Sequence, residues 1–147
     1  MVSSRSLEDL IPQVRALAES FVARAKEQGI DVVITSTYRD SEAQQALFDQ
    51  GRALPGTIVT YARPGDSFHN YRMAFDFAPI VGGKIPWGDS AVFTRLGQLG
   101  ESLGLDWAGR WTGSMREMAH LQWTGGLSLA QLKAGYLPSV DTDRAVA

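Results

Sequence analysis

The chain contains no cysteine and only two histidines among its 147 residues. The absence of cysteine excludes a disulfide scaffold, a cysteine-based zinc finger and thiol catalysis. Because histidine is so scarce, any metal site or acid–base site that uses imidazole has to involve His69, His120 or both. These two positions are therefore the first places to look for chemistry.

The chain also lacks an excess of positive charge. Its 14 Lys and Arg residues stand against 16 Asp and Glu residues, so the net charge is −2. A protein that binds nucleic acid normally carries a basic excess that neutralises phosphates, and a helix that binds anionic lipid carries a basic face. We therefore expect neither a nucleic-acid partner nor membrane insertion.

Long apolar runs are missing as well. No stretch approaches the ~20 apolar residues of a membrane-spanning helix. Near the start of the chain, Glu8 and Asp9 stand where a signal peptide needs an uninterrupted apolar segment. This pattern predicts synthesis in the cytoplasm without a signal peptide, so a protein that acts elsewhere would depend on another route of release.

The pattern of apolar and turn residues predicts one α+β domain over residues 1–138, followed by a polar, frayed tail over residues 139–147. Helices are expected at residues 7–26, 41–51, 90–104 and 129–133, the first capped by Ser6 and the last by Ser128. Strands are expected at residues 31–37, 73–78 and 119–124. Residues 52–66 contain two prolines and two glycines and are expected to form a loop.

Each histidine has a carboxylate nearby in the sequence. Asp76 follows His69 by seven residues, and Glu117 precedes His120 by three. A catalytic zinc site offers three nitrogen or oxygen ligands and leaves one position open. His69, Asp76 and His120 would supply that set, and Glu117 would remain as general base for the attacking water. Taken singly, such residues are more often solvated or simply hydrogen-bonded.

The residues around Asp76 indicate which way its side chain points. Phe75 and Phe77 flank it in the predicted strand. Since side chains alternate between the two faces of a strand, both phenyl rings would enter the core while the carboxylate faces a cleft.

Three segments of the chain carry these residues and their neighbours. They read SFHNYRMAFD over residues 67–76, EMAH over residues 117–120 with Trp123 after it, and STYR over residues 36–39 with Gln44 after it. The first resembles the pattern S-x-H-x-x-G-x-A-x-D and the second E/D-x-x-H, which together are typical of zinc peptidoglycan peptidases. That family includes D-alanyl-D-alanine carboxypeptidases and dipeptidases, and the L-alanyl-D-glutamate endopeptidases of phages and bacilli. The resemblance spans residues 7–126.

The resemblance implies a fold and a role for each matched residue. The fold would be a small antiparallel sheet with helices packed on it, as in the Hedgehog and D-Ala-D-Ala peptidase group. One Zn²⁺ would be held by His69, Asp76 and His120, with Glu117 as general base. Arg39 would stabilise the developing oxyanion. Gln44 would bind substrate or steady Arg39, and Ser67 would bind substrate or support a ligand.

One position departs from the family pattern. Arg72 stands where the family usually has glycine. A glycine at such a position indicates a positive φ angle or a close approach of the backbone. The backbone around Arg72 is therefore the part of the motif whose geometry the family pattern leaves open.

The resemblance favours an L-alanyl-D-glutamate endopeptidase of the endolysin type, acting on peptidoglycan stem peptides. A D-alanyl-D-alanine carboxypeptidase or dipeptidase with the same zinc chemistry is the alternative. A metal-bearing wall-binding module without hydrolysis is a third reading, but it would be expected to lack the general base that Glu117 provides. The endolysin reading implies a monomer that a holin releases to the cell wall.

Overall fold

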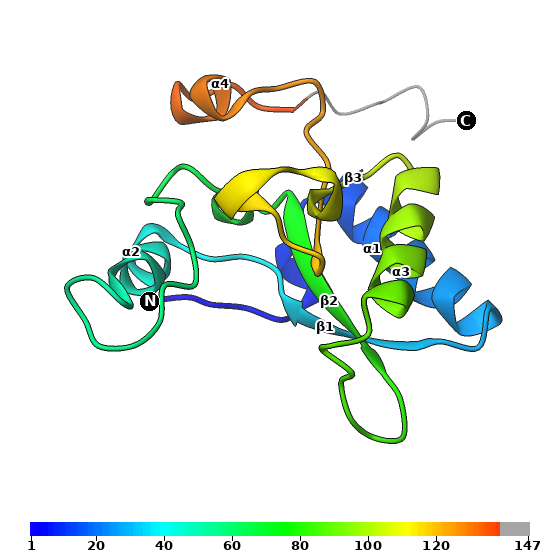
Figure 1. Ribbon diagram of the computed structural model, residues 1–147. Helices are drawn as coiled ribbons and strands as arrows, with labels where there is room; N and C mark the ends of the chain where they lie inside the picture. Colours follow the sequence, from blue (N-terminus) through cyan, green and yellow to red (C-terminus); the bar gives the residue numbers. More distant parts are fainter. Residues whose placement is uncertain (139–147) are drawn as a thin grey trace.

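A four-stranded antiparallel sheet forms the centre of the molecule (Figure 1). Its strands lie in the order β1-β2-β4-β3. The strands are β1 (Asp31–Ser36), β2 (Ala74–Ile80), β3 (Asp106–Trp107) and β4 (His120–Gln122). The computed structural model describes residues 1–138. The tail expected at residues 139–147 lies outside the described residues.

Among the described residues 1–138, four α-helices and four short 3-10 turns pack around this sheet. The helices are α1 (Pro12–Glu27), α2 (Ser41–Asp49), α3 (Ser90–Ser102) and α4 (Leu129–Lys133). The turns are η1 (Leu7–Asp9), η2 (Phe68–Tyr71), η3 (Ala108–Arg110) and η4 (Gly113–Met115). Within residues 1–138, no helix has both the length and the apolar character needed to cross a membrane.

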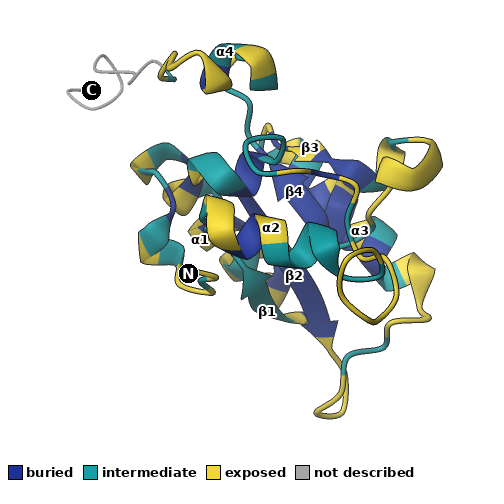
Figure 2. Ribbon diagram, turned by 90° about the vertical axis from the view of Figure 1, so that its left-hand side faces the viewer, coloured by how far each residue is buried: buried dark blue, intermediate teal, exposed yellow. Residues whose placement is uncertain are grey.

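The core lies between one face of the sheet and the helices α1 and α3, and the most buried ribbon gathers there (Figure 2). Phe21 of α1 packs against Phe75 and Phe77 of β2, with ring centroids 5.7 and 5.1 Å apart. All three side chains are fully buried. Burying a phenyl side chain contributes about 1.5–3 kcal/mol, so this cluster anchors β2 strongly. The predicted inward orientation of Phe75 and Phe77 is confirmed.

Two glycines in α3 allow the helix to lie against β3 and β4. A Cβ atom on Gly97 would lie 2.1 Å from the Trp107 ring, and one on Gly100 would lie 2.5 Å from a Leu121 methyl group. The Trp107 indole N–H also donates a hydrogen bond to the Met118 carbonyl oxygen at 2.9 Å. This close packing fixes the segment that leads into β4.

Most predicted elements are confirmed to within two residues at each end. The first helix is the exception, because it begins at Pro12 rather than at residue 7. A residue before proline is pushed out of the helical region, and Ile11 is extended with φ −62° and ψ 152°. Ser6 caps only the short turn η1. The two-residue strand β3 was not predicted from the sequence.

Arg72 adopts the left-handed conformation that glycine favours. Its φ of 62° and ψ of 30° close the turn η2 before β2 begins, and it is the one non-glycine residue with a positive φ in residues 1–138. The guanidinium lies 3.8 Å from the centre of the Tyr38 ring, and Nη1 donates to the Asp9 carbonyl oxygen at 3.1 Å. The side chain thus joins the start of the chain to the turn.

Replacing Arg72 should separate these two effects. Arg72→Ala loses the side-chain contacts and keeps the left-handed strain, whereas Arg72→Gly loses the contacts and removes the strain. We expect Arg72→Gly to be more stable than Arg72→Ala. Its free energy of unfolding, measured by urea denaturation, should be about 1 kcal/mol higher. Equal stability of the two variants would contradict a strained backbone at this position.

Candidate metal centre and cleft

The register of β2 and β4 brings Asp76 opposite His120. Both side chains leave the sheet on the face that is opposite to Phe75 and Phe77, because neighbouring residues of a strand point to opposite faces. The turn η2 delivers His69 to the same place. Its N-cap is Ser67, whose side-chain oxygen accepts the backbone N–H of His69 at 3.2 Å.

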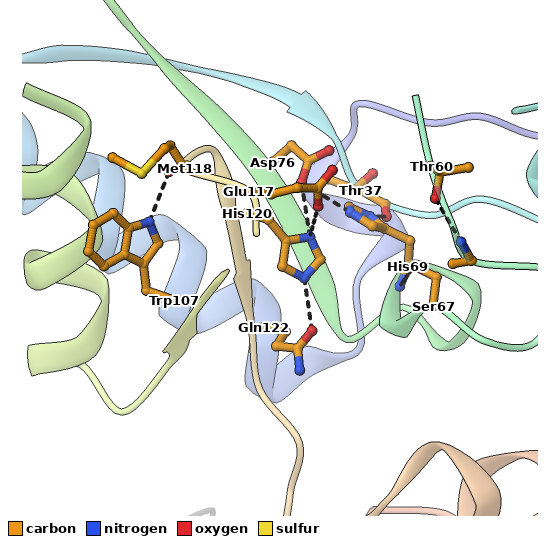
Figure 3. Close-up of polar contacts among 11 residues, drawn as sticks. Thr37, Thr60, Ser67, His69, Asp76, Trp107, Glu117, Met118, His120 and Gln122 are labelled. Atoms are coloured by element: carbon orange, nitrogen blue, oxygen red, sulfur yellow. Dashed lines mark hydrogen bonds and ion pairs between the residues drawn. The ribbon is translucent and has the colours of Figure 1, made fainter. Parts of the chain in front are cut away.

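The three side chains converge on one carboxylate oxygen (Figure 3). Asp76 Oδ1 lies 3.1 Å from His69 Nε2 and 3.2 Å from His120 Nδ1. The three candidate ligand atoms all lie within 4.8 Å of one another. Both imidazole rings are buried. The predicted set of ligands is therefore assembled from one turn and two strands.

The outer nitrogen of each ring is held by a hydrogen-bond partner. His69 Nδ1 lies 2.7 Å from the Thr37 carbonyl oxygen, which can only accept, so Nδ1 carries the proton. His120 Nε2 lies 2.8 Å from Gln122 Oε1. These partners fix the orientation of each ring and direct the other nitrogen towards Asp76.

This arrangement suits a cation. Burial lowers the pKa of His69, although Asp76 opposes the shift, so the ring is neutral near pH 7. Burial by itself would raise the pKa of Asp76, but the two histidines outweigh it and hold that pKa far below its usual range. The lone pair of His69 Nε2 then faces an anionic oxygen. Two acceptors at hydrogen-bond distance repel each other unless a positive charge lies between them.

His120 responds to the same negative charge. Burial lowers its pKa, but the hydrogen bond and charge of Asp76, together with Glu117, raise it above the usual value. The field that favours a proton on His120 also favours a divalent cation. Two imidazoles and one carboxylate are a donor set typical of zinc. His69, Asp76 and His120 thus fit a single zinc site.

Glu117 lies next to this group without belonging to it. Its Oε2 is 3.7 Å from His120 Nδ1, and 52% of its side chain is exposed. Burial of the other half raises the pKa of Glu117, and the charge of Asp76 adds to this, while His120 and Arg39 oppose it. A carboxylate with a raised pKa beside a metal site suits a general base.

Arg39 contributes the positive charge of the site. Its guanidinium is close enough to Asp76 and Glu117 for both carboxylates to oppose the lowering of its pKa by burial. Its Nε is buried and has no hydrogen-bond partner in the structure. An unpaired buried donor is costly, which indicates a role for this guanidinium in binding a ligand.

These side chains line an open cleft of about 580 Å³. One wall is the loop over residues 58–62, and the other includes Trp111 and residues 114–117. Ser67, His69, Asp76, Glu117, His120 and Arg39 all border it. The structure thus brings six of the seven predicted site residues to one surface.

Gln44 is the residue that the structure places elsewhere. It is fully buried, and its Nε2 donates to the Ala62 carbonyl oxygen at 2.8 Å. Its Oε1 accepts from Asn70 Nδ2 at 3.4 Å, and the same Asn70 nitrogen donates to the Arg39 carbonyl oxygen at 3.1 Å. Gln44 therefore steadies the Arg39 backbone through Asn70 and does not border the cleft.

Two supporting groups escaped the sequence analysis. Gln122 follows His120 by two residues, so strand alternation places both on the same face and offers a usable signal. The Thr37 group that holds His69 is a backbone carbonyl. No side-chain pattern can reveal such a group, because every residue has a carbonyl.

Comparison with known proteins gives two curated relatives of note. The peptidoglycan L-alanyl-D-glutamate endopeptidase CwlK of Bacillus subtilis is 37% identical over 123 residues, which cover 78% of this chain and 73% of the relative. The L-alanyl-D-glutamate peptidase of Listeria phage A118 is 29% identical over 124 residues. That match covers 81% of this chain but only 41% of the phage protein.

The fold also resembles solved structures. One is the vancomycin resistance D,D-pentapeptidase VanY, crystallised in complex with Zn(II), which superposes with a TM-score of 0.61 at 16% identity. The match covers 85% of this chain and 78% of that one. The expected peptidase fold is thereby confirmed. Over residues 8–125 the chain matches the family model of VanY, D-alanyl-D-alanine carboxypeptidase, and it belongs to that family.

Proposed function

We propose that this chain is a zinc-dependent peptidoglycan peptidase that hydrolyses the L-alanyl-D-glutamate bond of stem peptides. The observation that carries the proposal is the His69–Asp76–His120 group with Glu117 beside it. The choice of bond is supported by the endopeptidase from Bacillus subtilis that is 37% identical to this chain. The D-alanyl-D-alanine carboxypeptidase activity for which the family is described is the alternative.

His69 Nε2, Asp76 Oδ1 and His120 Nδ1 would hold the zinc ion. A zinc ion bound in such a site polarises the peptide carbonyl and lowers the pKa of water. The hydrogen bonds from the outer ring nitrogens to Thr37 and Gln122 keep both imidazoles in place. The protein therefore does not have to reorganise these ligands during the reaction.

Glu117 would take a proton from the attacking water and pass it to the leaving amine. Its exposed half gives the carboxylate access to the cleft, and its raised pKa brings its affinity for a proton closer to the working pH. Arg39 would bind the negative charge that develops on the carbonyl oxygen. Burial strengthens that interaction, because the guanidinium has little competing water.

The remaining assignments follow from the endolysin reading. Residues 1–138 would form the catalytic unit and act as a monomer on the cell wall. Release would depend on a holin, which is an indirect partner. The support is the phage peptidase among the relatives, although this chain spans only 41% of its length.

Product analysis tests the choice of bond. Purified peptidoglycan incubated with the protein should yield new L-alanine carboxyl ends and D-glutamate amino ends in mass spectra. A chelator should abolish these products and added zinc should restore them. Release of terminal D-alanine instead would show that the protein acts as a carboxypeptidase with the same zinc chemistry. No product from a protein that has bound zinc would favour a non-catalytic module.

Two substitutions distinguish the general base from a ligand. Glu117→Ala should keep stoichiometric zinc while kcat falls by about 10²–10⁴-fold, because only proton transfer is lost. His120→Ala should lose both zinc and activity, because a ligand is removed. Zinc content by atomic absorption and kcat on the same preparations decide the matter. Loss of zinc in Glu117→Ala would show that its assignment as base is wrong.

Gln122 should act on zinc affinity through His120. Gln122→Ala removes the acceptor for His120 Nε2–H and should weaken zinc binding by about 10–100-fold, whereas Gln122→Glu keeps an acceptor and should retain most of the affinity. Competition with a chromophoric chelator measures this. Gln45→Ala, an exposed glutamine on α2, is the matched control. An unchanged affinity for zinc in a folded Gln122→Ala protein would show that Gln122 does not support zinc binding through His120.

A further inference from the structure

We propose that a second, smaller hollow beside the metal centre receives the L-alanine end of the substrate, and that Trp87 determines specificity there. The proposal rests on the proposed function, because it assigns the two sides of the bond to be cut. The hollow has a volume of about 280 Å³. Its own walls are Trp87, Ser90, Phe93, Met118 and Ala119.

The hollow and the main cleft meet at the reacting groups. Asp76 and Glu117 border both of them. His69 borders only the main cleft, whereas Met118 borders only the small hollow. Figure 3 draws these two residues on opposite sides of the Asp76–Glu117–His120 group. If the bond to be cut lies at Glu117, the part of the substrate on one side of it would enter the main cleft and the part on the other side the small hollow.

The walls of the small hollow are held in place. The Trp87 ring stacks on Phe93, with centroids 5.8 Å apart and planes 17° apart, although 63% of Trp87 is exposed. Phe93 itself is buried in the core. On the other side, the Met118 carbonyl accepts the Trp107 indole N–H, and Arg116 Nη2 lies 3.4 Å from the Met118 sulfur. The subsite is therefore formed before substrate binds.

Charge assigns each end of the substrate to one hollow. The D-glutamate of a stem peptide is linked through its γ-carboxyl group, so its α-carboxylate is free. The main cleft offers Arg116 to such an anion, in addition to Arg39, which would bind the reacting carbonyl oxygen. The small hollow has no cationic wall residue to offset the two carboxylates that both hollows share. The L-alanine methyl group suits its apolar walls instead.

A pair of substrates that differ by one methyl group tests the subsite. The peptides are N-acetyl-L-Ala-γ-D-Glu-L-Lys and the same peptide with glycine in first place. We expect zinc-loaded wild-type protein to prefer L-alanine about tenfold in kcat/KM. Trp87→Ala should lose most of this preference, mainly through a higher KM. Tyr136→Ala, which removes an exposed aromatic ring outside both hollows, should keep it.

A third peptide checks the direction of binding. It carries D-isoglutamine, in which the α-carboxylate is an amide, in place of D-glutamate. Trp87→Ala should discriminate between these two residues as the wild type does. If Trp87→Ala changed this discrimination and left the L-alanine preference intact, the substrate would bind in the opposite direction and the proposal would be overturned.

A binding measurement separates failure of the subsite from failure of the proposed function. N-acetyl-L-alaninamide, which carries no charge, is titrated into ¹⁵N-labelled, zinc-loaded protein, and the two indole signals are assigned with Trp87→Phe and Trp111→Phe. The Trp87 signal should shift more than that of Trp111, which borders the main cleft. This result needs no turnover, so it holds even if the wild type releases D-alanine instead. A shift confined to Trp111 would refute the subsite.

Discussion

The structure of the site depends on one carboxylate oxygen shared by two imidazoles. Asp76 Oδ1 is within hydrogen-bond distance of both His69 and His120, whose rings are buried, and the Asp76 side chain itself is only 24% exposed. A buried carboxylate is unfavourable unless positive charge or hydrogen-bond donors compensate it. Thr37 keeps the His69 proton on the far nitrogen, so His69 offers Asp76 a lone pair and His120 alone can donate to it. A cation between the three groups would satisfy all of them, which is why this arrangement suits a metal ion.

Strand β2, which carries Asp76, connects this site to the core. Phe75 and Phe77 fix β2 against Phe21, and Asp76 between them is directed to the opposite face. A shift of one residue in the register of β2 would bring the carboxylate into the core and a phenyl ring into the cleft. Core packing therefore fixes the side of the sheet on which Asp76 meets the two histidines.

The sequence predicted the parts of the site that follow from periodicity and motif. Strand alternation placed Asp76 on the cleft face, and the motifs identified His69, His120, Glu117 and Arg39 as partners of Asp76. It did not predict what depends on tertiary packing. The role of Gln44 follows from its contacts with Ala62 and Asn70, which lie 18 and 26 residues away in the chain. Strand β3 has only two residues, so it offers no period to recognise.

Glu117 shows how the fold separates a base from the ligands. It lies just before β4 rather than within it, and its backbone N–H is held by the Ala108 carbonyl oxygen at 3.2 Å. Its carboxylate can therefore reach the cleft, while His120, three residues later, is fixed in the strand opposite Asp76. If β4 began at Glu117, strand alternation would place this side chain on the face opposite to that of His120, three residues later. The late start of β4 therefore allows Glu117 and His120 to lie on the same side.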